Sequence, residues 1–289
     1  MSLTVVGDAC VDIITPFGDY VPGETHHRQV ITRCGGTASV AVHLARLGGE
    51  AKFVGKVGSD LFGEYFRQNL KSNAVQDFVS EDRSHPTGVC ISLVHDNGER
   101  TMVASRGAND YLQRDEVEGR LEEIVSAGAA YFSGYSLLYG ETAATVLYLM
   151  EKCRENNCVV YFNPGAPNLM RADFPELIRR YADALILNME EARILGGCDD
   201  VSGIAGALSY AVDLAVITAG EDGCMLARGG EYRRIATEKT KVTDTTGAGD
   251  AFSAGFIYGK LEGMTDEESA GVGNRAALSW LREAAVSHE

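Results

Sequence analysis

One stretch near the end of the chain combines glycines, a carboxylate and an apolar run. Gly247 and Gly249 flank Ala248, so the backbone there can bend tightly and turn its N–H groups outward. The apolar run that follows, residues 251–257, predicts a helix, and the unsatisfied N–H groups of a helix start attract anions. Asp250 would lie beside such an anion, where a carboxylate can accept the proton of an attacking hydroxyl. The stretch therefore indicates transfer of a phosphoryl group to an alcohol.

The same stretch also has a simpler interpretation. Asp250 could be an N-cap residue on a tight turn, with no part in any reaction. For the stretch taken alone this alternative is favoured, so the phosphoryl-transfer hypothesis depends on what the other segments add.

The length and the net charge of the chain limit the classes of protein to which it can belong. Its 289 residues suffice for a substantial core, in two small domains or in one large α/β domain. The net charge of −15 and the pI of about 4.9 argue against sequence-independent binding to nucleic acid or to an anionic membrane. A local anion site built from backbone N–H groups is compatible with this charge.

Cysteine usage and the N-terminus indicate the compartment. The seven cysteines are an odd number, are widely spaced and include no Cys-x-x-Cys pair, so we expect free thiols in a reducing cytoplasm. The first residues lack a basic region and a long apolar run, and no segment reaches the roughly 20 apolar residues that span a bilayer. We therefore expect a cytoplasmic protein with no membrane partner.

Short apolar runs alternate with helix-like segments along most of the chain, which predicts an α/β fold. The first run, residues 3–6, ends at Gly7 and Asp8 without the Gly-x-Gly-x-x-Gly of a dinucleotide-binding fold. Further strands are expected near residues 52–57, 129–133, 158–163, 184–188, 213–218 and 223–228. Helices are expected after Gly36 and Asp60, and near residues 114–126, 141–156, 173–182, 190–196, 202–211, 251–261 and 265–286. Trp280 is expected in the core, without a role.

Two segments depart from this alternation. Residues 13–33 contain prolines and a glycine followed by an alternating run, which indicates a strand excursion away from the main sheet. Residues 87–104 contain two β-rich runs around Asn97 and Gly98, a hairpin signal. Together they predict a small separate sheet, formed by about 13–33 and 87–105, that could act as a lid.

Polar residues follow two of the predicted strands, where ligands of an open α/β sheet bind. Asn188 and Glu191 follow the strand at 184–188, and Glu191 could hold a hydrated Mg²⁺. The alternative is that Glu191 is merely a favourable charge in a first helical turn. Gly220 and Gly223 follow the next strand, and these glycines could also form only a hairpin turn.

Together these segments resemble the PfkB (ribokinase-like) family of carbohydrate and nucleoside kinases, over essentially the whole chain. The strongest match is residues 244–252, and the second runs from residue 35 to residue 48. Supporting matches are residues 55–63, 188–191 and 218–223. The resemblance implies one domain over residues 1–289, a three-layer α/β/α sandwich with a small β-sheet lid. It also implies ATP-dependent phosphorylation of an alcohol with Mg²⁺ as cofactor.

The resemblance further implies roles for individual residues. It makes Asp250 the base, and it places the anion hole at Gly247, Ala248 and Gly249. Phosphate and Mg²⁺ are expected near Asn188 and Glu191, and a monovalent cation such as K⁺ near Asp244. The nucleotide site is expected at Thr218, Gly220 and Gly223, with Asn274 near the adenine. Substrate hydroxyls are expected at Asp12, Gly35, Gly36, Ser39 and Asn109.

The departures from the family pattern concern the substrate. Ser39 stands where the family usually has a substrate-binding Asn, and the strand at 131–135 lacks the glutamate that ribokinases offer to ribose. Arg100 or Arg106 could bring a positive charge that selects a sugar acid such as 2-keto-3-deoxygluconate. The interpretation of both as solvated lid charges is favoured. We therefore expect a sugar or sugar-acid kinase and leave the particular sugar open.

Two other functions fit parts of this pattern. A nucleoside kinase of the same family would share every catalytic motif. A sugar-binding regulator without activity could lose Asp250 or the glycine turn without penalty, yet the sequence has both. We also expect a homodimer through the lid, because its apolar face needs a cover and family members often pair in this way.

Overall fold

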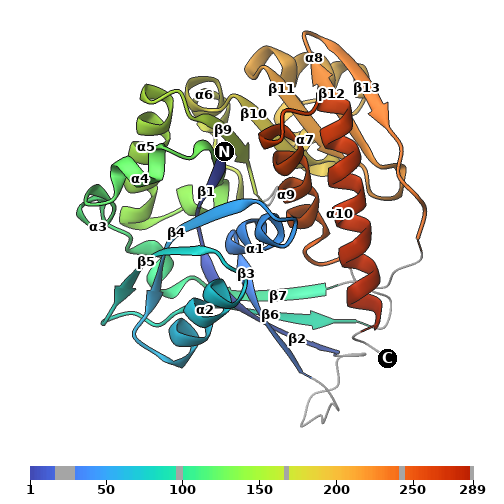
Figure 1. Cartoon of the computed structure of the whole chain (residues 1–289). Coiled ribbons are helices and arrows are strands. Elements are labelled where there is room, and N and C mark those ends of the chain that lie inside the picture. Colours follow the sequence, from blue (N-terminus) through green and yellow to red (C-terminus); the bar gives the residue numbers. More distant parts are fainter. Residues whose placement is uncertain (17–29, 96–99, 166–168, 241–244, 287–289) are drawn as a thin grey trace.

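The main β-sheet forms the centre of the molecule. The computed structural model describes residues 1–16, 30–95, 100–165, 169–240 and 245–286. In these residues the main sheet has nine strands in the order β13-β12-β11-β10-β9-β8-β1-β4-β5 (Figure 1). The strands are β1 (Ser2–Val6), β4 (Glu50–Gly58), β5 (Gln76–Asp82), β8 (Gly128–Ser133), β9 (Val159–Asn163), β10 (Ala184–Asn188), β11 (Leu214–Thr218), β12 (Cys224–Arg228) and β13 (Glu231–Ile235). Neighbours from β5 to β11 pair in parallel, whereas β12 is antiparallel to both of its neighbours.

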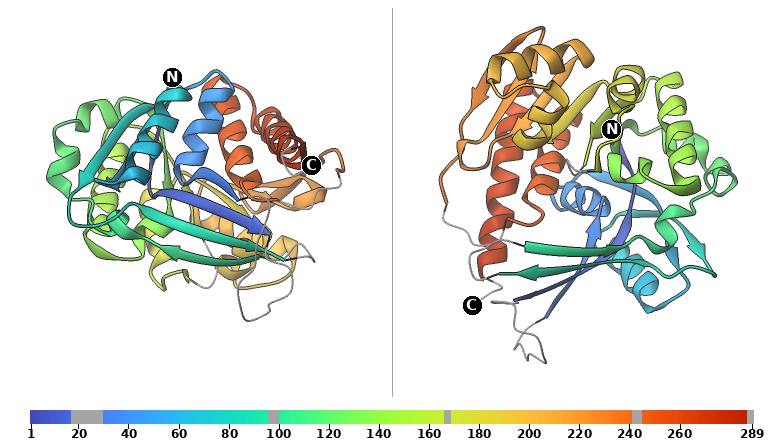
Figure 2. Two further views of the ribbon diagram at one scale, coloured as in Figure 1. Left: turned by 90° about the horizontal axis from the view of Figure 1, so that it is seen from below. Right: turned by 180° about the vertical axis from the view of Figure 1, so that it is seen from behind.

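Helices cover both faces of this sheet (Figures 1 and 2). One face carries α1 (Ala38–Arg46), α2 (Leu61–Ser72), α9 (Ala248–Leu261) and α10 (Asp266–Val286). The other carries α3 (Arg114–Glu118), α4 (Leu121–Val125), α5 (Gly140–Glu155), α6 (Phe174–Tyr181), α7 (Met189–Gly196) and α8 (Val201–Ala211). The predicted three-layer α/β/α sandwich is therefore confirmed.

A smaller second sheet lies along one edge of this body. Its four strands are β3 (Ile31–Gly36), β2 (Ala9–Pro16), β6 (Gly88–Val94) and β7 (Arg100–Ser105), in that order. Figure 2, left, shows this sheet nearest to the viewer. The predicted hairpin pairing of β6 with β7 is confirmed, while its turn at 96–99 lies outside the described residues. The sheet extends beyond the expected residues 13–33 to residues 9–12 and 34–36, because β2 begins at Ala9 and β3 ends at Gly36.

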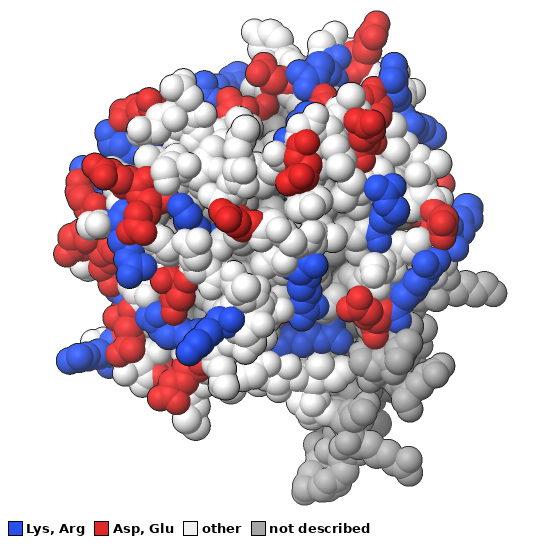
Figure 3. All heavy atoms as spheres, in the orientation of Figure 1, with Lys and Arg blue, Asp and Glu red and all other residues white. Residues whose placement is uncertain are grey.

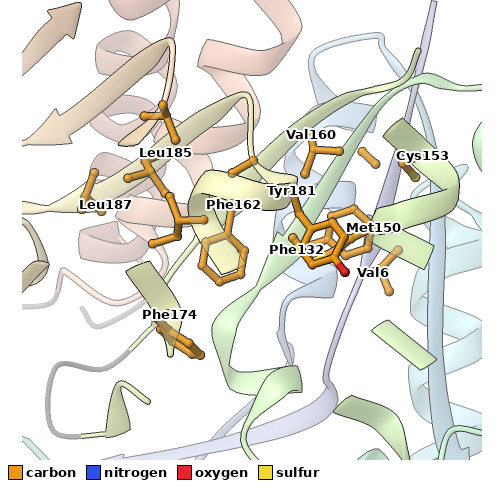
Figure 4. Packing of buried hydrophobic residues seen from close by; sticks show 14 of the residues in the cluster. Val6, Phe132, Met150, Cys153, Val160, Phe162, Phe174, Tyr181, Leu185 and Leu187 are labelled. Atoms are coloured by element: carbon orange, nitrogen blue, oxygen red, sulfur yellow. The ribbon is translucent and has the colours of Figure 1, made fainter. Parts of the chain in front are cut away.

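Alternation along the strands supplies a separate core to each helical layer. Val5 packs on the side of α1 and α9, whereas Val6 packs on the side of α5. Figure 3 shows acidic and basic side chains interspersed over the outside of one face. Figure 4 shows residues of the core on the side of α5, among them Phe162 and Phe174, whose rings pack edge to face with centroids 5.8 Å apart. Such parallel strands are buried on both faces and therefore read as continuous apolar runs.

The sequence prediction missed the two edge strands, β5 and β13. Both are rich in charged residues, and β13 is exposed along most of its length. Charged edge strands prevent pairing with other chains, but they also hide the strand from pattern analysis. The predicted helix at 114–126 was wrong in one respect, because Gly119 ends α3 and a new helix begins at Leu121.

Asp60 joins the main sheet to the second sheet. Its carboxylate caps α2 by accepting from the N–H of Gly63, and it accepts from both the N–H and the hydroxyl of Thr87, just before β6. Burial raises the pKa of Asp60, but the hydrogen bonds from Thr87 and Gly63 outweigh it and lower the pKa overall. The charged carboxylate therefore stabilises the fold above the pKa of the unfolded chain, and this stabilisation is lost as the pH falls through the lower folded value.

We predict that Asp60→Ala lowers the free energy of unfolding by about 2–3 kcal/mol at pH 7, because a helix cap and two charge-assisted hydrogen bonds are lost. Urea denaturation followed by circular dichroism measures this change. Asp213→Ala, at an exposed position before β11, is the matched control and should change stability by less than about 0.5 kcal/mol. Equal effects of the two substitutions would show that Asp60 does not join the sheets as described.

Candidate active site

A glycine turn places Asp250 in the first turn of α9. Gly247 has a φ of +81° and occupies the N-cap position, so α9 begins at Ala248 and Asp250 is its third residue. A side chain at Gly247 would meet the indole of Trp280, with a Cβ 2.9 Å from Nε1. Gly247, and not Asp250, is thus the N-cap residue, so the capping interpretation does not explain the carboxylate.

The same turn offers unpaired donors. Within the described residues, the N–H groups of Gly249 and Asp250 have no hydrogen-bond partner, whereas that of Ala248 reaches the carbonyl of Thr245. These free groups point out of the start of a 14-residue helix, whose dipole is positive at this end. The turn can therefore bind an anion.

Three cavities meet around this turn. The Asp12 cavity has a volume of about 280 Å³ and lies between the second sheet, α1 and α10; its lining includes Asp12, Gly36, Ser39, Gly247 and Asp250. The Glu191 cavity has about 180 Å³ and lies at the ends of β10 and β11; its lining includes Asn188, Glu191, Thr218, Gly249 and Asp250. The Asn274 cavity has about 270 Å³ and lies between β11, β12, α9 and α10; its lining includes Thr218, Gly220, Gly223, Gly249 and Asn274.

Shared lining residues connect the three cavities in a row. Asp250 lines both the Asp12 cavity and the Glu191 cavity. Thr218 and Gly249 line both the Glu191 cavity and the Asn274 cavity. The Glu191 cavity is therefore the middle one, with Asp250 at one end and Gly249 at the other.

Burial and like charge set the protonation of the two central aspartates. Burial and then the negative charge of Asp12 raise the pKa of Asp250 to about 7. Burial likewise raises the pKa of Asp12 to about 6, although the positive charge of Arg33 opposes this. Near neutral pH both carboxyls can therefore exchange protons, which suits a proton acceptor.

A capping box fixes Glu191. Its carboxylate accepts from the N–H and the side-chain amide of Asn188, at 3.0 and 2.9 Å, while its own N–H donates to Asn188. Burial raises the pKa of Glu191 to about 7, although the hydrogen bonds from Asn188 and Asn163 oppose this. No group of three or more His, Cys, Asp or Glu side chains that could hold a metal occurs in the described residues. The carboxylate of Glu191 in this cavity instead fits a hydrated Mg²⁺, which needs only one or two carboxylates beside phosphate oxygens.

Comparison with known proteins agrees with this arrangement. Residues 2–286 match the pfkB family carbohydrate kinases. The chain belongs to this family.

The chain is 30% identical over 245 residues to an uncharacterized sugar kinase of Archaeoglobus fulgidus, covering 83% of this chain and 94% of that protein. It is 30% identical to a fructokinase of Klebsiella pneumoniae, covering 92% and 87%. A solved adenosine kinase from Sinorhizobium meliloti superposes with a TM-score of 0.87 at 26% identity, covering 96% and 92%. The ribokinase-like fold is thereby confirmed, and the protein is an ATP-dependent carbohydrate kinase.

In this kinase the paired glycines of β3 fit closely around Asp12. A Cβ on Gly35 would overlap the carboxylate of Asp12, and one on Gly36, which has a φ of +66°, would overlap the carbonyl of Asp8. Of the two, Gly36 lines the Asp12 cavity, whereas Gly35 lies beneath Asp12. Both glycines thus allow the backbone of β3 to lie close against neighbouring chain, and Gly36 also reaches the cavity.

Asn274, Gly220 and Gly223, which were expected at the nucleotide site, all line the Asn274 cavity. The side-chain amide of Asn274 donates to the carbonyls of Ile235 and Ala236, both at 3.2 Å, and so holds the end of β13 against α10. Gly220 and Gly223 have φ values of +58° and +85° in the hairpin turn. The hairpin and ligand-site interpretations of these glycines are therefore compatible.

Several predicted residues are not brought into these cavities. Asn109 is buried and uses its side chain to bind both main-chain groups of Ala9 and the carbonyl of Arg106, so it supports β2 instead of facing substrate. Arg106, directly after β7, is largely buried and pairs with Asp8 and Asp110, so it is not a solvated lid charge. Asp244 and the side chain of Arg100 lie outside the described residues.

Further lining residues were missed by the sequence analysis. Arg33 lies opposite Asp12 in the β2–β3 pairing, and Trp280 of α10 closes the same cavity, so its predicted role as a core residue was wrong. Tyr131 lies in the Glu191 cavity, where burial and the charge of Asp250 raise the pKa of its hydroxyl. The strand register would have found Arg33, because residues directly opposite each other in a sheet share a face.

Two general expectations were tested in the described residues. All seven cysteines lie there and are free thiols. No helix in that part of the chain is both long and apolar enough to cross a membrane.

We predict that Gly35→Ala weakens acceptor use, because the added Cβ must push the Asp12 carboxylate aside. The expected loss in kcat/KM for the best acceptor is about 10- to 100-fold, with a melting temperature within a few degrees of wild type. Gly206→Ala in α8, where a Cβ meets nothing within 4 Å, is the matched control and should keep full activity. Unchanged kcat/KM in the first variant would show that the position of Asp12 does not matter.

Proposed function

We propose that this kinase transfers the γ-phosphoryl group of ATP to a hydroxyl group of a sugar or sugar acid. The supporting observation is that Asp250 lines both the Asp12 cavity and the Glu191 cavity. An acceptor hydroxyl in the first cavity and a phosphoryl group in the second would both reach this carboxylate. Membership of a carbohydrate kinase family supports the same reaction.

Asp250 would act as the general base. Its pKa of about 7 means that roughly half of the molecules carry the charged carboxylate at neutral pH. A base is most effective when its pKa lies near the working pH, because it is then both available and able to bind the proton. The acceptor hydroxyl would lose its proton to Asp250 as it attacks the phosphoryl group.

The turn before α9 would stabilise the charge on the transferred group. The free N–H groups of Gly249 and Asp250 lie at the positive end of the α9 dipole. Catalysis of phosphoryl transfer depends mainly on positioning and on such fixed positive ends. By comparison with other anion holes, each donor would contribute about 10²- to 10³-fold to the rate.

The nucleotide would occupy the Asn274 cavity, with its phosphates directed past Thr218 and Gly249 toward the Glu191 cavity. Glu191, held in place by Asn188, would bind Mg²⁺ through water, and the ion would neutralise charge between phosphate oxygens. A monovalent cation such as K⁺ near Asp244 stays a prediction, because this residue lies outside the described part of the chain.

A nucleoside kinase is the second candidate, and the likeness to an adenosine kinase is compatible with it without favouring it over a sugar kinase. The two functions differ in the acceptor that the Asp12 cavity takes. A panel of sugars, sugar acids and nucleosides, assayed for ADP production with Mg-ATP, separates them. A nucleoside preferred by more than about 100-fold in kcat/KM, which is about 2.7 kcal/mol, would overturn the choice of a sugar.

We predict that Asp250→Asn lowers kcat by about 10²- to 10⁴-fold, because the amide keeps the shape but cannot accept the proton. ADP production measures the rate, and calorimetry should show nearly unchanged ATP binding. The wild-type rate should fall below about pH 7, where Asp250 becomes protonated. The exposed Asp213→Asn is the control and should retain full activity. A rate for Asp250→Asn within a few-fold of wild type would contradict the proposed base.

We further propose that the protein is a cytoplasmic homodimer joined through the second sheet. Its free cysteines suit a reducing compartment. Ile91 and Val103 are paired on the side of the second sheet opposite to Asp12 and are 39% and 58% exposed. A partner subunit would cover this apolar strip.

We predict a solution mass of twice the 31.0 kDa chain mass at micromolar concentration, measured by light scattering after size exclusion. Val103→Glu should produce monomers, because a charge would be buried in the interface. Tyr210→Glu, on the exposed surface of α8, is the control and should stay dimeric. A monomeric wild-type protein would refute the dimer.

A further inference from the structure

Arg33 is a cation of the Asp12 cavity without a counter-ion in contact. It lies on β3 directly opposite Asp12 of β2 and lines the cavity together with Asp250. In the described residues it forms no ion pair, and its Nη1 is shielded from water with no hydrogen-bond partner. A buried donor left unpaired costs free energy, so this position favours a ligand that supplies an acceptor.

Trp280 holds this guanidinium in place. The guanidinium carbon of Arg33 lies 5.2 Å from the centre of the indole ring, which stabilises the cation by a cation–π contact. The indole Nε1 donates to the carbonyl of Thr246 at 2.6 Å, and the ring packs edge to face on His43 at 4.7 Å. Arg33 is therefore positioned relative to the turn at Gly247.

The cavity mouth carries a second arginine. Arg46 of α1 lines the same cavity, with its Nε bound to the side chain of Asn73. Burial and then the charge of Arg46 lower the pKa of His43 to about 4, so His43 is neutral at pH 7. Figure 3 shows basic side chains together in the region between α1 and α10 of Figure 1.

We propose that the acceptor carries an anionic group, a carboxylate or a phosphate, that Arg33 binds while Arg46 attracts it at the mouth. The guanidinium fork matches both groups, because each offers paired oxygens to two N–H donors. Asp12 and Asp250 would hold hydroxyls of the same molecule. This inference rests on the proposed function and names the class of its substrate.

Arg33 does not serve simply as a partner for Asp12. An arginine in that role would form an ion pair, yet no such pair joins the two residues. Arg106, which the sequence suggested as the cation for a sugar acid, is already bound by Asp8 and Asp110. Within the described residues, Arg33 is thus the arginine of this cavity with a buried donor left over.

Direct binding tests the inference without any need for turnover. Calorimetry with a non-hydrolysable ATP analogue present compares 2-keto-3-deoxygluconate and fructose 6-phosphate with fructose, glucose and adenosine. We expect one anionic ligand to bind at least 10-fold more tightly than its neutral counterpart. Arg33→Gln should remove about 10- to 100-fold of that affinity and weaken the binding of neutral ligands by a much smaller factor. Arg33→Lys, which keeps the charge but loses the fork, should recover part of it.

Arg83→Gln removes an equal charge at a position outside the cavity and should leave the preference intact. A preference for the carboxylate or for the phosphate identifies which anion is used. Equal binding of neutral and anionic ligands, or a preference that survives Arg33→Gln in a folded variant, overturns the inference. Phosphorylation of neutral sugars in that case would leave the proposed function standing. Conversely, Arg33-dependent anion binding without ADP production from any acceptor would defeat the proposed function alone.

Discussion

The site depends on holding two carboxylates, Asp12 and Asp250, in one cavity between packed elements. Like charges in such surroundings repel strongly, which is one cause of the raised pKa of Asp250. Two positive groups offset this repulsion, the N-terminal end of α9 and the guanidinium of Arg33 on β3. The two carboxylates can thus coexist because β2, β3 and α9, which are separate segments of the chain, are packed together at this point.

The connection between the two sheets fixes this meeting. Asp8, between β1 and β2, accepts two hydrogen bonds from Arg106 and one from Ser136, while its own N–H donates to the hydroxyl of Thr37. These contacts hold the N-terminal end of β2 against the end of β7, the segment after β8 and the start of α1. Asp12 lies on β2 four residues beyond Asp8. Its position is therefore fixed by the contacts that hold the start of β2 against the main sheet. The burial of Asp8 is tolerated since a bidentate arginine compensates its charge.

Much of this site could be predicted because its chemistry is local in sequence. The turn at Gly247, the carboxylate of Asp250 and the capping pair of Asn188 with Glu191 each lie within a few neighbouring residues, so spacing alone indicates them. The role of Asn109 could not be read in this way, since its bonds reach Ala9, 100 residues away. Arg33 was missed for the same reason, because its meaning depends on the register of β2 against β3 and on the packing of α10. The edge strands β5 and β13 were not predicted, because their charged side chains interrupt the apolar pattern by which the inner strands were predicted.

Trp280 joins the Asp12 cavity to the turn before α9. Its ring carries Arg33, and its Nε1–H holds the carbonyl of Thr246, the residue before the N-cap of α9. A change in the position of Arg33 therefore acts on the same indole that supports the anion turn. Coupling between two sites is reciprocal in free energy, so an acceptor that orders Arg33 would favour the turn geometry that binds the phosphoryl group, and the reverse. In the proposed reaction, this one side chain of α10 would link acceptor recognition to the stabilisation of charge during transfer.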